Sequence, residues 1–133
     1  LNAKVNTDFN KLNDEAFLGN KINTNKLLAQ TGMDNEKNIF YLNIINQRLE
    51  KLLQINNLNK STIEDAINSL KPPVFWKDKP NLTNQAKKWN KFKVQKMINL
   101  TFKLEKKIKS NNLIEKNILI KKLLVDICSL ANA

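Results

Sequence analysis

The distribution of glycine and proline is the strongest constraint on how this chain can fold. Its 133 residues include only two glycines, Gly19 and Gly32, and three prolines, all within residues 72–80. Both residue types punctuate regular structure, and turn-rich β folds depend on them. No segment shows the sustained apolar–polar alternation of a half-buried strand. The sequence therefore predicts one all-α domain, a bundle of six or seven helices.

The N-terminal part predicts a leader followed by two short helices. We expect residues 1–7 to be a disordered leader or linker and residues 8–133 to form the helical domain. Side chains that favour helix starts and glycines that favour helix ends mark the boundaries. The expected caps are Asp8 and Thr24, and the expected ends are Gly19 and Gly32.

Longer helices are predicted where apolar residues recur every three or four positions. The longest is expected over residues 35–57, and two others over 91–110 and 114–130, separated at Asn111 and Asn112. In the first of these, the inward positions are Ile39, Phe40, Leu42, Ile44, Ile45, Leu49, Leu52 and Leu53. In the last, they are Ile118, Leu119, Leu123, Leu124, Ile127 and Leu130. Ser61 to Glu64 reads as a capping box that opens a shorter helix.

Two conspicuous side chains are predicted to belong to the core. Trp89 follows Leu82 and Ala86 at helical spacing, so its ring is expected to face inward. Cys128 lies among leucines and isoleucines of the last helix, where a small buried apolar residue is expected rather than a nucleophile.

The residue types needed for most catalytic sites are missing. The chain has no His, one Cys and no glycine-rich loop. Zinc sites need Cys/His clusters, phosphate-cradling loops need glycines, and acid–base catalysis near neutral pH most often uses His. No apolar run approaches the roughly 20 residues of a membrane span. We expect no catalytic residue, metal, cofactor or membrane contact in this sequence, and one cysteine is compatible with the cytoplasm.

Positive charge is concentrated in residues 71–109. This stretch has 12 lysines against Asp78 and Glu105, a net charge of +10 in a chain of total charge +11. Heavy use of Asn, Lys and Ile is typical of an AT-rich genome, but that bias does not explain the local concentration. By itself the charge fits a solvated surface as well as a nucleic-acid interface. The candidate phosphate contacts are Lys77, Lys79, Lys87, Lys88 and Lys91.

Trp76 favours the nucleic-acid interpretation. It follows two consecutive prolines, which keep the segment out of a helix. An exposed indole beside Lys77 could stack on an unpaired base while lysines neutralise phosphates. The alternative is that Val74 or Phe75 fills the core and Trp76 covers it.

The run Leu70–Lys77 (LKPPVFWK) resembles the "PPVFFK" signature in the C-terminal domain of bacterial DNA polymerase III delta subunits. Asp14–Gly19 (DEAFLG) is similar to that family's "DAAFLGD"-type helix end. Further matching positions are Gln85 and Trp89 in the next helix, and Glu105 and Lys109 near a helix end. The resemblance spans about residues 8–131. It departs from the family at Thr31–Asp34, where the family more often has a Glu before its Gly, and in its lysine density.

The resemblance implies a non-catalytic collar domain of a clamp-loader subunit, which helps to load the sliding clamp onto primed DNA in the bacterial cytoplasm. The implied partners are the tau/gamma and delta-prime subunits and primer–template or single-stranded DNA. The sliding clamp would be gripped only by an N-terminal AAA+-like module, absent from this sequence, so we expect the chain to be a fragment. Phe92 and Phe102 fall off the inward stripe and are the expected subunit-interface residues. The alternatives are an independent helical nucleic-acid-binding protein and a small enzyme with a nonstandard site.

Overall fold

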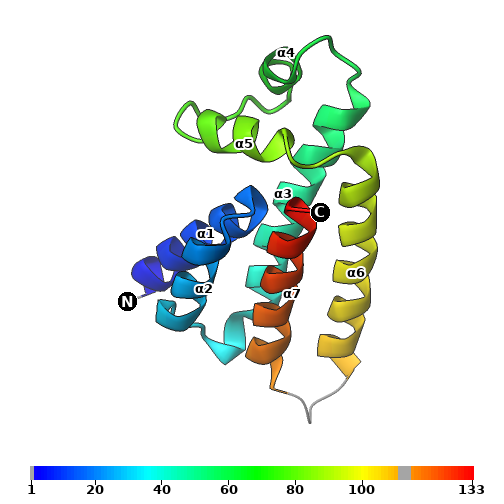
Figure 1. The fold of residues 1–133 in the computed structure, drawn as a ribbon. Helices are drawn as coiled ribbons and strands as arrows, with labels where there is room; N and C mark the ends of the chain where they lie inside the picture. Colours follow the sequence, from blue (N-terminus) through cyan, green and yellow to red (C-terminus); the bar gives the residue numbers. More distant parts are fainter. Residues whose placement is uncertain (1, 111–114) are drawn as a thin grey trace.

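The computed structural model describes residues 2–110 and 115–133, with side chains from residue 8 onward. Within these ranges the chain forms seven α-helices and one 3₁₀ turn, without a strand (Figure 1). They are α1 (Asn2–Leu18), α2 (Lys21–Gln30), η1 (Asn35–Lys37), α3 (Asn38–Asn57), α4 (Ile63–Asn68), α5 (Lys79–Ala86), α6 (Lys91–Ser110) and α7 (Lys116–Ala131). The predicted all-α bundle is confirmed. The predicted break at Asn111 and Asn112 lies outside the described residues.

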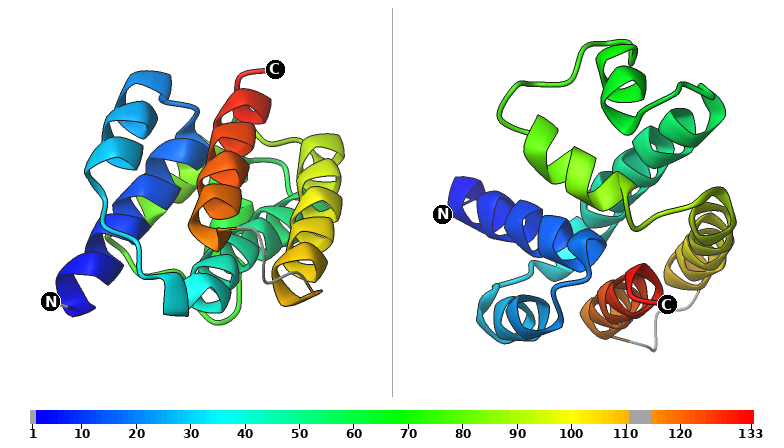
Figure 2. Two further views of the ribbon diagram at one scale, coloured as in Figure 1. Left: turned by 90° about the horizontal axis from the view of Figure 1, so that it is seen from below. Right: turned by 45° about the horizontal axis from the view of Figure 1, so that its top comes forward.

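The helices form a bundle with a two-helix cap at one end. In the bundle, α1 packs against α2 and α7, while α3 packs against α6 and α7. The short helices α4 and α5 pack against each other and lie together at the end of the bundle where α7 terminates (Figures 1 and 2). Pro72 and Pro73 lie in the segment between these two helices and Pro80 lies in the first turn of α5, so all three prolines of the chain belong to the cap.

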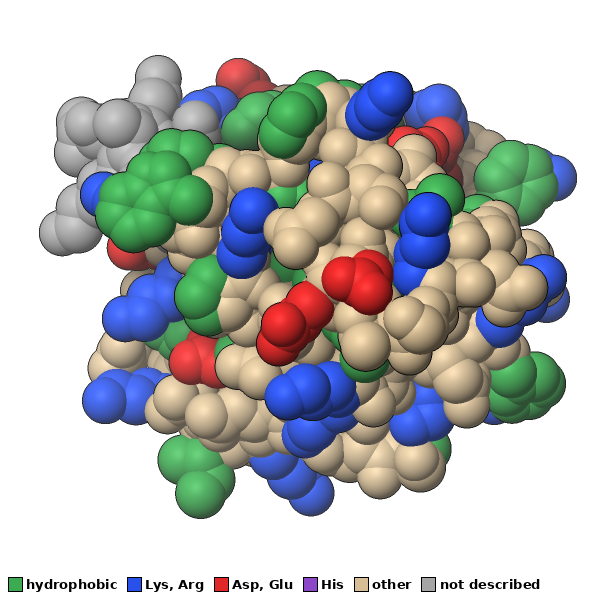
Figure 3. All heavy atoms as spheres, turned by 90° about the horizontal axis from the view of Figure 1, so that it is seen from above, with side chains coloured by type: hydrophobic (Ala, Val, Ile, Leu, Met, Phe, Trp, Pro, Cys, Tyr) green, Lys and Arg blue, Asp and Glu red, His purple; other side chains and the backbone are tan. Residues whose placement is uncertain are grey.

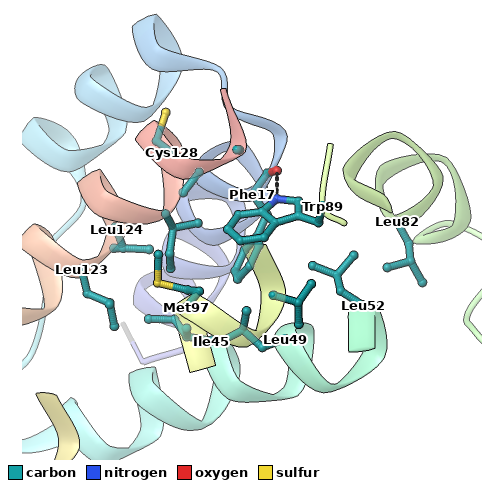
Figure 4. Packing of buried hydrophobic residues seen from close by; sticks show 14 of the residues in the cluster. Phe17, Ile45, Leu49, Leu52, Leu82, Trp89, Met97, Leu123, Leu124 and Cys128 are labelled. Carbon is teal, nitrogen blue, oxygen red and sulfur yellow. Dashed lines mark hydrogen bonds between the residues drawn. The ribbon is translucent and has the colours of Figure 1, made fainter. Parts of the chain in front are cut away.

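A single apolar core connects the bundle to this cap. Trp89, which follows α5, is 1% exposed, and its ring centroid lies 5.3 Å from that of Phe17 on α1. Leucines and isoleucines of α3 and α7 surround this pair, together with Met97 of α6 (Figure 4). Trp89 and Cys128 are both buried, as predicted. Burial of so many large aliphatic and aromatic side chains is the main stabilising contribution in a domain of this size.

Helix α1 ends as the sequence predicts but begins earlier. Gly19 has a φ of 73°, and its N–H donates to the carbonyl of Ala16 at 3.0 Å, so glycine ends the helix in the left-handed region. A Cβ at position 19 would lie 2.7 Å from Oδ1 of Asn132, which reinforces the requirement for glycine. The helix starts at Asn2, so Asp8 is an internal residue and not its cap.

The predicted start of α2 is wrong, whereas its end lies within two residues of the predicted Gly32. Its cap is Asn20, whose Oδ1 accepts the backbone N–H of Asn23 at 3.1 Å, whereas Thr24 is buried inside the helix. At the other end Thr31 is the C-cap and donates its N–H to the carbonyl of Leu27 at 2.8 Å. Asn20 directly follows Gly19, so α2 begins immediately after the glycine that ends α1.

The inward face of α3 differs from the prediction at its first turn. Ile39 and Phe40 are 44% and 41% exposed, and Tyr41 is buried in their place. The tyrosine ring stacks on Phe9 with centroids 4.4 Å apart, and its hydroxyl accepts the N–H of Asp34 at 2.8 Å. These two contacts fix which side of the first turn faces α1. Further along, the predicted core positions are confirmed and include Leu42, Ile45, Leu49 and Leu52.

Two smaller corrections concern α4 and α7. The α4 cap is one residue later than predicted: the hydroxyl of Thr62 accepts the N–H of Asp65 at 3.0 Å. On α7, Ile118 is 59% exposed, because the buried face of this helix begins with Ile120.

Candidate nucleic-acid interface

Trp76 lies in the turn between α4 and α5 and is 69% exposed. Its neighbour Phe75 is 62% exposed, whereas Val74 is buried. Val74 therefore fills the core, as one alternative required, but Trp76 does not cover it. The ammonium of Lys77 lies 5.4 Å from the indole centroid, a cation–π distance. An exposed ring with a cation beside it can offer both a stacking surface and a phosphate contact.

The turn that carries Trp76 is tied to the bundle by Arg48 of α3. Nη2 of Arg48 donates to both carboxylate oxygens of Asp78, at 2.9 and 3.0 Å, and lies 3.5 Å from Oδ1 of Asp14 on α1. The arginine side chain is 10% exposed, against 23% for Asp78 and 28% for Asp14. These three residues, the Arg48 cluster, connect the start of α5 to α1 and α3.

Burial dominates the electrostatics of the Arg48 cluster at Asp14. Desolvation raises the pKa of this carboxyl above its ordinary value of 3.8, and the neighbouring Asp78 raises it further. Attraction to Arg48 lowers the pKa but does not compensate, which is consistent with the long 3.5 Å contact. Asp78 therefore makes the stronger ion pair with Arg48.

Sequence reasoning missed the Arg48 cluster, although one signal was present. Arg48 is the only arginine among 23 basic residues, and it lies beside Leu49 on the inward side of a predicted helix. Arginine suits buried pairing with carboxylates better than lysine does. A single arginine at such a position, in a chain that otherwise uses lysine, indicates a buried ion pair. Its partners lie 30 and 34 residues away and could not be chosen from spacing.

A cleft of about 450 Å³ adjoins Trp76 between α4 and α5. Lys79 lines it as well, and the Lys79 ammonium donates to Oδ1 of Asn68 on α4 at 3.1 Å. Glu64 contributes an acidic group to the same wall. The cleft therefore offers an aromatic face, an amide and charges of both signs beside the exposed ring.

The other predicted lysines lie at the opposite end of α5. Lys87 and Lys88 follow this helix and Lys91 begins α6. Helix α5 has 8 residues, so it separates this group from Trp76 by roughly 12 Å at 1.5 Å per residue. Lys87 shares a second hollow, of about 330 Å³, with Lys60. The structure thus divides the predicted site into two groups of lysines. The end-on view from the side of α4 and α5 shows basic side chains spread over this surface, with a few acidic ones between them (Figure 3).

Some of the lysines make hydrogen bonds inside the domain. Besides Lys79, the ammonium of Lys88 donates to Oδ1 of Asn132 at 3.3 Å. Among the described residues, Lys77, Lys87 and Lys91 make no hydrogen bond or ion pair through their ammonium groups, so these three are the most available for phosphate.

Phe92 and Phe102 both lie on the outer side of α6, 72% and 57% exposed. The ammonium of Lys106 lies 4.5 Å from the ring centroid of Phe102. The two rings are ten positions apart, roughly 15 Å along the helix. Their exposure agrees with their predicted place off the inward stripe, and their role at a subunit interface stays a prediction.

One side chain from α5 and one from the segment after it bind backbone carbonyls at the C-terminal end of α1. Nε2 of Gln85 donates to the carbonyl of Asp14 at 3.0 Å, and Nε1 of Trp89 donates to the carbonyl of Phe17 at 2.8 Å. The Phe17 carbonyl is among the last four of α1, which have no partner within the helix. Asn132 completes the arrangement by donating to the carbonyl of Gly19 at 2.7 Å.

The described residues contain no group of three or more His, Cys, Asp or Glu side chains arranged to hold a metal ion. In the same parts of the chain, no helix combines the length and apolar character that crossing a membrane requires.

Comparisons of the chain with models of known protein families, with curated proteins and with solved structures gave no match.

Proposed function

We propose that this chain is the helical collar domain of a clamp-loader delta subunit, a non-catalytic scaffold that joins the tau/gamma and delta-prime subunits. In this function the domain helps to hold the loader together while the sliding clamp is placed on primed DNA. The activity of the whole assembly resides in other parts of it, and the sliding clamp is contacted by an N-terminal module outside this sequence.

The observation that supports this proposal is the convergence of the residues that carry the resemblance. Asp14–Gly19, the run from Leu70 to Lys77, Gln85 and Trp89 are far apart in the sequence. Gln85 and Trp89 donate hydrogen bonds to carbonyls of α1 within the first motif. Asp78, the next residue after the second motif, is bound through Arg48 to the same end of α1. Gln85 and Trp89 thus contact the first motif directly, and the second motif is linked to it through its sequence neighbour Asp78.

Assembly with the partner subunits tests the proposal. The chain mixed with the tau/gamma and delta-prime subunits of its source organism should co-elute with them in size-exclusion chromatography. A variant with both Phe92→Ser and Phe102→Ser should elute alone, because exposed aromatic side chains are common anchors of protein interfaces. Circular dichroism should show that this variant remains folded, since both rings are largely exposed. Separate elution of the unaltered chain would refute the proposed assembly.

Contact with DNA is the second part of the proposed function. Stacking of one base on Trp76 is worth about 1–3 kcal/mol and tolerates any sequence. In the assembled loader, Trp76→Ala should weaken binding to primed or single-stranded DNA with little change in salt dependence. Lys77→Ala combined with Lys87→Ala should instead reduce the salt slope by about one unit per lost phosphate contact. Fully duplex DNA should be insensitive to loss of the ring, because its bases are already stacked.

The second candidate is an independent helical nucleic-acid-binding protein. It is favoured by the exposure of Trp76 beside Lys77, which requires no partner subunit. Binding of the isolated chain to single-stranded DNA, lost in Trp76→Ala, combined with separate elution from the loader subunits, would support this candidate instead.

A further inference from the structure

A narrow groove between α6 and α7 lies outside the surface discussed above. The two helices run side by side along the bundle (Figures 1 and 2). Leu100 and Leu104 of α6 and Leu119 and Leu123 of α7 line it, each pair spaced by four residues and so aligned on one helix face. Leu123 is buried, Leu104 and Leu119 are half-buried, and Leu100 is 37% exposed. The floor is thus aliphatic and open to a partner at its outer edge.

The rim of this groove is basic. Lys103 and Lys107 line it on the α6 side and Lys122 on the α7 side, with Asp126 as the one acidic residue. All three lysines are exposed, and none forms an ion pair with another described residue. An occupant that places carboxylates along both edges would therefore gain favourable electrostatics without breaking an existing pair.

The size and composition of the groove indicate what kind of occupant fits. Its volume is about 180 Å³, below the roughly 300–1,000 Å³ typical of small-molecule sites. That space suits one or two apolar side chains. Nucleic acid would use the lysines, but it would gain little from a leucine floor, since bases stack on aromatic rings and none lines this groove.

We propose that the α6–α7 groove docks an acidic amphipathic helix of a protein partner, which inserts an apolar side chain between the leucine rows and places carboxylates on Lys103, Lys107 and Lys122. This is the helix-in-groove mode, in which apolar anchors supply affinity and flanking charges supply orientation and specificity. The proposal is independent of the proposed collar function, because it uses neither Trp76 nor the exposed phenylalanines of α6.

A labelled synthetic peptide tests this docking on the complete 133-residue chain. The probe is an amphipathic helix with Leu and Phe on one face and Glu on the other. The matched control replaces each Glu by Lys. Fluorescence anisotropy should show binding of the Glu peptide only, weakening as salt is added because the rim charges are exposed.

Two variants separate the floor from the rim. Leu100→Gln should lower the affinity for the Glu peptide roughly tenfold, as expected for a contact at the centre of an interface. Lys103→Glu with Lys107→Glu should lower it by a similar factor. Lys87→Glu with Lys91→Glu changes net charge equally at the other end of the molecule and should leave binding nearly unchanged. The variants should keep the helical circular dichroism of the parent, because the altered side chains are exposed.

Three results would overturn the proposal. The first is that neither the Glu peptide nor its Lys control binds the chain. The second is binding that Leu100→Gln leaves unchanged, since the apolar floor would then play no part. The third is binding of oligodeoxythymidine that is lost in Lys103→Glu with Lys107→Glu but insensitive to Leu100→Gln, which would make the rim a phosphate-binding surface.

Discussion

Replacement of Arg48 by Met should destabilise the domain strongly, because it removes the ion pair that ties the turn carrying Trp76 to the bundle. Met keeps an unbranched apolar stem but removes the guanidinium that binds Asp78 at 2.9 Å. The carboxylates of Asp14 and Asp78 would then face each other with no cation between them. Removing one partner of a buried ion pair typically costs 3–5 kcal/mol. Because the two carboxylates are 28% and 23% exposed, we expect the lower end, about 3 kcal/mol.

Urea denaturation followed by circular dichroism at neutral pH measures this loss directly. The midpoint should fall while the slope stays constant, which would show a loss of stability without a change in the surface exposed on unfolding. Arg48→Lys is the matched control: it keeps a charge but not the planar fork, so a smaller loss is expected. Adding Asp78→Asn to Arg48→Met should recover part of the stability by removing a stranded carboxylate, a coupling of roughly 1 kcal/mol. A loss below about 0.5 kcal/mol in Arg48→Met would refute the reasoning, since that is the range of surface substitutions.

Three further predictions concern the core and the same cluster. Asp14→Asn should become more stable relative to the parent chain as pH rises. Burial raises the pKa of Asp14, so the stability that its protonated carboxyl contributes is fully present below the ordinary pKa of 3.8 and is lost as pH rises through the higher folded-state pKa. Denaturation of both chains at several pH values would detect or exclude this trend. Leu49→Ala should cost about 2–5 kcal/mol by leaving a cavity, and a near-zero cost would mean that the inward face of α3 is misassigned. Trp89→Phe should cost about 1–3 kcal/mol through loss of ring volume and of the N–H bond to the Phe17 carbonyl, with Trp76→Phe as the exposed control that should cost almost nothing.

The helices could be predicted from the sequence because their signals are local. Apolar spacing located α3, α6 and α7, and the glycine at position 19 marked the end of α1. The helix-capping residues are harder to predict, because several residues with suitable side chains stand close together. Asn20 rather than Thr24 accepts the capping hydrogen bond of α2, and Thr62 rather than Ser61 accepts that of α4. These competing candidates lie only one to four residues apart and have side chains that can all cap a helix, so residue type alone does not choose between them.

The candidate site was predicted less completely, because its parts depend on long-range contacts. The prolines placed Trp76 outside a helix but left open whether its ring was exposed or covered the core, and in the structure the ring is exposed. The same basic stretch suggested one continuous surface, but α5 separates Lys77 and Lys79 from Lys87 and Lys91. The Arg48 cluster joins residues of α1, α3 and the segment just before α5. No periodicity within any one of these segments could have paired them.

The assembly claim is tested most directly by native mass spectrometry of the chain mixed with the tau/gamma and delta-prime subunits of its source organism. Collar function predicts a species that contains one copy of this chain together with both partner subunits, and its loss in the variant with Phe92→Ser and Phe102→Ser. A spectrum in which the unaltered, folded chain remains entirely free of both subunits would contradict it.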